Sequence, residues 1–239
     1  MKPQIPWLRV FVEGVVIVTS ILLAFGIDAW WAGIESRRDA HRELGTVLEE
    51  VHEVRAQLQV VALWRERELS AASSVQSRLE GASPDEPIAL PDTLFALSFG
   101  VLLINDAPTQ AAAAFVTSGQ VDEVEDVELR RALLAWTSAL ADLREDEVRF
   151  GTEVVGQLWD DFYDRALWGW ALDLIGAAFL AGPLAPVASG SEDVLVTYST
   201  RARNLSALWT SSTRLLSRQT LALLDQAEAL MGMIERELR

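Results

Sequence analysis

The sequence contains no cysteine and only two histidines among its 239 residues. Without cysteine there are no disulfides, thiolate metal sites or cysteine nucleophiles, although an oxidising compartment remains possible. Two histidines rule out most Ser-His-acid arrangements, and the sequence has no Gly-x-Ser-x-Gly, Gly-x-Gly-x-x-Gly or Walker motif. We therefore expect a protein that is not an enzyme and that has no cofactor of its own.

A metal site is also not expected. Glu49 and His52 have the Glu-x-x-His spacing of di-iron bundles, but such a site needs a second copy of the motif. The other histidine, His41, lies 11 residues away, about 16 Å along a helix axis. We expect His52 to be solvated or salt-bridged. The carboxylates of residues 122–128 lack the pattern of a calcium loop and are interpreted as capping the next helix.

Lysine occurs once, at Lys2, and acidic residues outnumber basic ones by 35 to 20, for a net charge of -15. Glu13 and Asp28 lie in the first 34 residues with Lys2 and Arg9, so 33 acidic and 18 basic residues follow, which again gives -15. Such a surface repels nucleic acid and attracts basic partners. We expect no nucleic-acid partner, whereas a basic soluble partner such as an electron carrier would fit.

The sequence has one apolar run that water cannot easily accommodate. Residues 14–27 alone cover about 21 Å, but residues 8–31 cover about 36 Å, enough to cross a hydrocarbon core of about 30 Å. Trp7 lies at one boundary, and Trp30 and Trp31 lie at the other, as in an aromatic belt. The alternative is a cleaved signal peptide, but residues 29–32 are a poor cleavage site. We favour an uncleaved anchor over residues 1–34, inserted in the lipid bilayer.

One face of this anchor is small and polar. At 100° per residue, Glu13, Ser20, Ala24 and Trp31 fall within about 20° of one line, with Asp28 about 60° away. Either both carboxylates are hydrated at the two interfaces, or this face packs on another transmembrane helix. The candidate partner-binding residues in the span are Glu13, Ser20, Ala24, Asp28, Trp30 and Trp31.

Basic residues flank the span on both sides, so counting them does not decide its orientation. A short basic leader before a single span and a long domain favours an inside N-terminus. We expect a single-pass protein of the bacterial inner membrane with its C-terminal domain in the periplasm.

Residues 35–239 predict an extramembrane bundle of long helices, and the fold class is therefore all-α. The first helix continues out of the membrane with an apolar stripe that breaks at Arg65 and resumes in a shifted register. We interpret this stripe as intramolecular packing, with a homo-oligomeric coiled coil as the alternative. The stripe comprises Leu44, Val47, Val51, Val54, Leu58 and Val61, followed by Leu69, Ala72, Val75 and Leu79.

Further helices are predicted over residues 93–104 and 109–117, from Val127 to about Tyr163, and over residues 192–238. The spacing of Ser189 and Glu192 fits a capping box for the last helix, which we expect to return along the first. No sustained alternation of apolar and polar residues was found, so a sheet is not expected.

Residues 166–181 form a second apolar stretch, which contains Trp168, Trp170 and Phe179. It is short for a membrane span and has an acid, Asp173, in its middle. Three interpretations remain open: a buried helix or loop, a docking surface for a membrane partner, and contact with the lipid surface.

Two parts of the chain contain recognisable motifs. In the span they are Glu13, Ser20, residues 22–25 (Leu-Leu-Ala-Phe) and residues 28–30 (Asp-Ala-Trp). Downstream they are residues 118–121 (Ser-Gly-Gln-Val) and 126–133, which begin a Leu-Arg helix. Together these motifs resemble a group of uncharacterised bacterial single-pass membrane proteins. The resemblance covers roughly the first 150 residues in pattern, and it implies architecture only.

These observations predict a non-catalytic, membrane-anchored accessory or scaffolding subunit of a larger bacterial membrane complex, in contact with other integral membrane subunits. A photosynthetic reaction-centre or light-harvesting complex is one specific host that we consider. The alternative is a self-associating membrane-anchored sensor whose helical domain binds a ligand.

Overall fold

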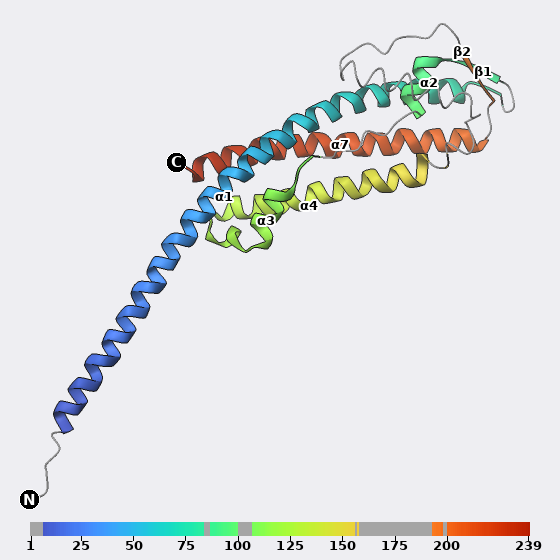
Figure 1. The fold of residues 1–239 in the computed structure, drawn as a ribbon. Coiled ribbons are helices and arrows are strands. Elements are labelled where there is room, and N and C mark those ends of the chain that lie inside the picture. Colours follow the sequence, from blue (N-terminus) through green and yellow to red (C-terminus); the bar gives the residue numbers. More distant parts are fainter. Residues whose placement is uncertain (1–6, 84–86, 100–106, 156, 158–192, 198–199) are drawn as a thin grey trace, which may run out of the picture.

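The computed structural model describes residues 7–83, 87–99, 107–155, 157, 193–197 and 200–239. Its dominant element is helix α1, which runs without interruption from Trp7 to Glu80, 74 residues or about 110 Å. The N-terminal part of α1 projects alone, and the C-terminal part packs into a bundle (Figure 1). The prediction of a helix that continues from the apolar span into an all-α bundle is confirmed.

The described part of the bundle contains two further long helices, α4 (Val127–Phe150) and α7 (Thr200–Glu237). Arg55 of α1 contacts Glu228 of α7, and Arg65 contacts Thr220, so α7 runs antiparallel to α1. The last helix therefore returns along the first, as predicted. Helix α4 runs parallel to α1 and packs against α7 (Figure 1).

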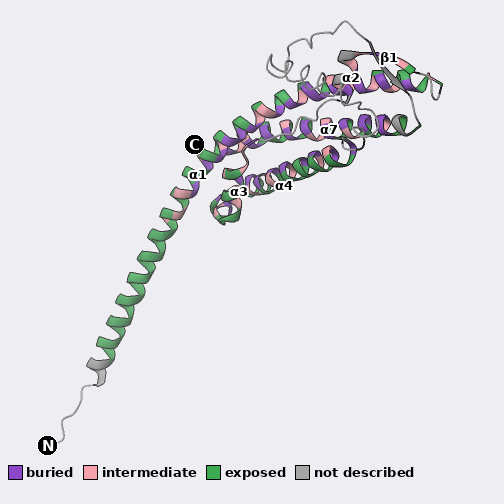
Figure 2. Ribbon diagram, turned by 45° about the vertical axis from the view of Figure 1, so that its right-hand side comes forward, coloured by how far each residue is buried: buried purple, intermediate pink, exposed green. Residues whose placement is uncertain are grey.

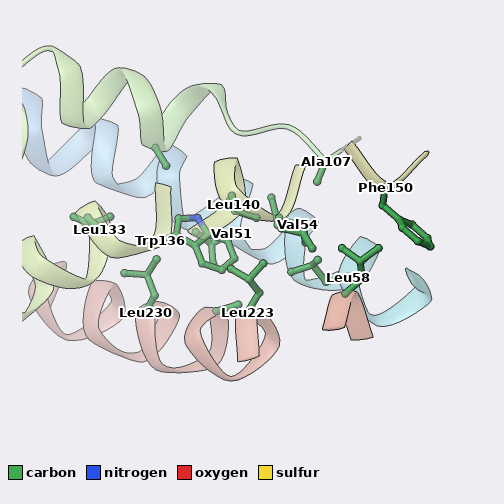
Figure 3. Packing of buried hydrophobic residues seen from close by; sticks show 14 of the residues in the cluster. Val51, Val54, Leu58, Ala107, Leu133, Trp136, Leu140, Phe150, Leu223 and Leu230 are labelled. Atoms are coloured by element: carbon green, nitrogen blue, oxygen red, sulfur yellow. The ribbon is translucent and has the colours of Figure 1, made fainter. Parts of the chain in front are cut away.

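The predicted stripe of α1 forms the core. All six residues of its first part, from Leu44 to Val61, are at most 4% exposed. Trp136 of α4 meets Val51 of α1 and Leu223 of α7 in the same apolar cluster (Figure 3). This packing supports the intramolecular interpretation of the stripe, because the chain's own helices cover it.

A short helix, α3 (Gln110–Thr117), is held against α1 by hydrogen bonds to a carboxylate of α1. Glu50 accepts hydrogen bonds from the backbone N–H groups of Ala111, at 2.6 Å, and Ala112, at 3.0 Å. These are first-turn donors that have no partner within the helix. After α3 the chain turns at Gly119, with φ 82°, into a 3-10 turn, η1 (Gln120–Glu123). A residue without Cβ adopts this conformation at little cost.

The start of α4 is capped by a side chain. Asp126 accepts hydrogen bonds from the N–H groups of Glu128, at 2.8 Å, and Leu129, at 3.3 Å. We expect Asp126→Ala to lower the free energy of unfolding by about 1 kcal/mol, since it removes the acceptor for two orphan donors. Asp126→Asn should retain most of the stability. Chemical denaturation followed by circular dichroism compares the two, and equal losses would contradict the capping role.

The expectation that no sheet forms is wrong. Strand β1 (Pro87–Pro91) pairs antiparallel with β2 (Asp193–Thr197), with Pro87 opposite Thr197 and Pro91 opposite Asp193. Residues 193–197 are rich in β-branched side chains, and a two-stranded ribbon tolerates proline because each strand has a free edge. The strands are too distant in sequence to show a hairpin signal. The last helix consequently begins at Thr200, and the predicted capping box at Ser189 lies outside the described residues.

The helix predicted over residues 93–104 is found as α2 (Asp92–Phe99), which packs on the distal part of α1. Helix α4 is α-helical to Phe150 and then passes into a π-helical turn, η2 (Gly151–Val155). Its expected continuation to Tyr163, like the apolar stretch of residues 166–181, lies outside the described residues.

Candidate functional site

The first candidate is the exposed span, defined here as residues 11–33 of α1. Every residue in it is exposed, and large apolar side chains lie open on all sides, with Phe11 70%, Leu22 65% and Phe25 68% exposed (Figure 2). Its most apolar 18 residues have a mean hydropathy of 2.0. Within the described part of the chain, this is the one helix whose length and composition would allow it to cross a membrane.

The six predicted partner-binding residues of the anchor all lie on the exposed span: Glu13, Ser20, Ala24, Asp28, Trp30 and Trp31. The Ser20 hydroxyl donates to the carbonyl of Val16 at 2.8 Å, which satisfies this group within the helix. The rings of Trp30 and Trp31 meet edge to face, with centroids 6.5 Å apart. The other predicted contacts, Trp168, Trp170 and Phe179, lie outside the described residues.

A groove on the exposed span was not anticipated from the sequence. It is centred on Gly26 and lined by Thr19, Leu22, Leu23, Gly26, Ile27 and Trp30. A Cβ at Gly26 would meet nothing within 4 Å, so the packing of this chain does not require glycine there. At 100° per residue Gly26 lies about 120° around the helix from Ser20, and Ile27, at about 20° from Ser20, borders both faces. The heptad spacing of Thr19, Gly26 and Gly33 was the available signal.

The second candidate is the charge cluster, defined here as Arg65, Glu68 and Glu147. These side chains are at most 1% exposed, inside the bundle where α1, α4 and α7 meet. One guanidinium nitrogen of Arg65 pairs with Glu147. Another donates to the carbonyl of Leu216 at 2.9 Å and to the Thr220 hydroxyl. Arg65 therefore ties α1 to both other long helices.

Glu68 lies one helical turn beyond Arg65 and has a different environment. One of its oxygens accepts a hydrogen bond from the indole N–H of Trp64 at 2.7 Å, and the other is buried and has no hydrogen-bond partner among the residues that the structure describes. Burial raises the pKa of Glu68 to about 8, although the Trp64 hydrogen bond and the charge of Arg65 oppose this rise. Burial also lowers the pKa of Arg65, against the opposing effect of Glu147.

The sequence contains a signal for each residue of the charge cluster. Arg65 was interpreted as a break in the stripe of α1, whereas it is buried and α1 stays helical through it. Glu147 follows Leu140 and Leu143 at helical spacing, so it belongs to the buried face of α4. Glu68 takes the buried position that had been expected for Leu69, which is only partly buried. A charged residue in phase with an apolar stripe is the pattern to notice.

No group of three or more potential metal ligands occurs within the ranges that the structure describes. His41 and His52 both lie exposed on α1. Comparison with known proteins adds no template for a site. No protein-family model, curated protein or solved structure matches this chain. The exposed span and the charge cluster are thus the two features on which a function can be built.

Proposed function

We propose that this protein is a non-catalytic, membrane-anchored accessory or scaffolding subunit of a larger bacterial membrane complex. One observation carries the proposal: 23 consecutive exposed positions of α1, residues 11–33, precede the bundle. They extend about 34 Å, close to the thickness of a bilayer's hydrocarbon core. Contact of this apolar surface with water is unfavourable, and insertion in a bilayer removes the surface from water.

The anchor also has the features of a helix that packs against others. Its Ser20 and Ala24 face and its Gly26 groove point in different directions, and both allow close approach of a neighbouring helix. Two such faces suit a position between two transmembrane helices of other subunits. Carboxylates such as Asp28 at the edge of the span would find donors there.

We place the bundle on the periplasmic side of the inner membrane. Its excess of acidic residues suits a basic soluble partner such as an electron carrier, which would be steered toward it. A photosynthetic complex is one host in which such a carrier would serve.

Extraction in mild detergent tests the function. We expect the full chain in the membrane fraction and, after solubilisation, in a complex with other membrane subunits that native mass spectrometry can identify. Ser20→Leu combined with Ala24→Leu should weaken co-migration about tenfold, or about 1.4 kcal/mol, because bulk is added to the small face. The matched control, Val18→Leu, adds bulk at an exposed position about 120° or more around the helix from Ser20 and Ala24.

Recovery of intact, folded protein from the soluble fraction would contradict membrane anchoring.

A second candidate function, a self-associating sensor, is favoured by the continuity of α1 from the exposed span through the charge cluster. A homodimer without other subunits in the same extraction would support the sensor and contradict the accessory role.

A further inference from the structure

Among the described residues, the charge cluster contains two acidic side chains and one basic side chain. The described elements bring Arg65 and Glu68 from α1 and Glu147 from α4, and all three are buried. From α7 come the hydroxyls of Thr213 and Thr220, while the charged residues Arg214 and Arg218 are exposed. Arg65 pairs with Glu147, so it balances that carboxylate. An ionised Glu68 would be a second negative charge that this one guanidinium cannot also neutralise.

The hydrogen bonds around Glu68 also favour its neutral form over its ionised form. Trp64 supplies one donor, but the second carboxyl oxygen is buried and finds no partner in the described part of the chain. On α7, Thr213 is 1% exposed, and its hydroxyl likewise has no partner among the described residues. Because Arg65 contacts Thr220 and the helices are antiparallel, Thr213 lies near the level of Glu68. A neutral carboxylic acid is tolerated in such surroundings, whereas an unpaired carboxylate is costly.

We propose that Glu68 is a proton-responsive switch of the bundle. While Glu68 carries its proton, the seam between α1 and α7 stays closed. When the proton leaves to bulk water, the buried anion gains hydration only if this seam opens, so α1 and α7 separate around Glu68. This inference goes beyond the proposed function, since it concerns regulation of the bundle in either an accessory subunit or a sensor. The raised pKa of Glu68 supports it by placing the transition near neutral pH rather than in acid.

The absence of cysteine makes a direct test possible, because two introduced cysteines are the only sites for spin labels. Ser70→Cys on α1 and Ser211→Cys on α7 are exposed positions near the level of Glu68. We would measure the distance between the labels by double electron–electron resonance, on the full chain in detergent micelles, from pH 6 to 9.5. The expected result is a longer and broader distance distribution at high pH, with a midpoint near pH 8, reversed on return to pH 6.

Three variants in the same labelled background identify the responsible group. Glu68→Gln should keep the closed distance over the whole range, because its amide cannot ionise. Glu66→Gln, which changes an exposed carboxylate on the same helix, should behave like the parent chain. Trp64→Phe removes the donor that favours the charged form, so the midpoint should move to higher pH.

A distance that does not change between pH 6 and 9.5 in the parent chain would overturn the proposal. So would a change of the same size and midpoint in Glu68→Gln. If circular dichroism shows that Glu68→Gln does not fold at pH 6, Trp64→Phe decides. An upward shift of its midpoint supports the switch, and an unchanged or lowered midpoint overturns it. This distance measurement does not depend on membrane insertion. A negative result for the switch can therefore be distinguished from failure of the proposed function.

Discussion

Arg65→Met is expected to lower the free energy of unfolding by about 3–5 kcal/mol, because it breaks the buried ion pair of Arg65 with Glu147. The substitution also removes the hydrogen bonds that Arg65 donates to the Leu216 carbonyl and the Thr220 hydroxyl of α7. Denaturant titration of the full chain in detergent, followed by far-ultraviolet circular dichroism, measures the change. A cost of this size is a large fraction of the stability of a typical domain.

The double variant Arg65→Met, Glu147→Met separates charge from packing. Replacing both members of a buried ion pair by apolar side chains of similar volume is often neutral or even stabilising. We therefore expect the double variant to be more stable than Arg65→Met alone. The matched control is Arg37→Met, which removes the exposed pair of Arg37 and Glu125, separated by 3.4 Å, and should cost at most about 1 kcal/mol. Equal effects of Arg65→Met and Arg37→Met would contradict a buried, desolvated pair.

Elements with a strong local signal were predicted correctly. The stripe from Leu44 to Val61 repeats at 3 and 4 residues, which specifies one buried face whatever the partner. The end of α3 near Gly119 and the cap at Asp126 depend only on neighbouring backbone groups, and both are found in the structure. The exposed span likewise depends on its own length and composition.

Features that depend on distant pairing were missed for a physical reason. Strand β2 is defined by β1, more than a hundred residues earlier, and no local turn links them. The charge cluster also depends on distant pairing, because Arg65 of α1 and Glu147 of α4 form an ion pair inside the bundle. A pattern of residues along one helix can show that a charged position faces inward, but it does not show which residue on another helix neutralises it.

Stability should fall with pH because of Glu68, opposite to the usual effect of a salt-bridged carboxylate. Its pKa is about 8 in the folded bundle and about 4.5 ordinarily, so the folded state holds this proton more tightly than the unfolded state. The resulting stabilisation is fully present below about pH 4.5, declines as pH rises, and is lost once pH passes about 8. Over that window the slope approaches about 1.4 kcal/mol per pH unit, several kcal/mol in total.

Glu68→Gln isolates this contribution, because every other titrating group is common to the two chains. The free energy of unfolding of each, measured in detergent at intervals from pH 5 to 9, gives a difference from which the other carboxylates cancel. We expect this difference to move in favour of Glu68→Gln with rising pH, since the amide has no proton to lose. The difference should become constant above about pH 8, where Glu68 is ionised in both states. If the free energies of unfolding of the two chains instead change with pH in parallel, Glu68 is hydrated in the folded chain. The charge cluster would then be a surface feature rather than part of the core.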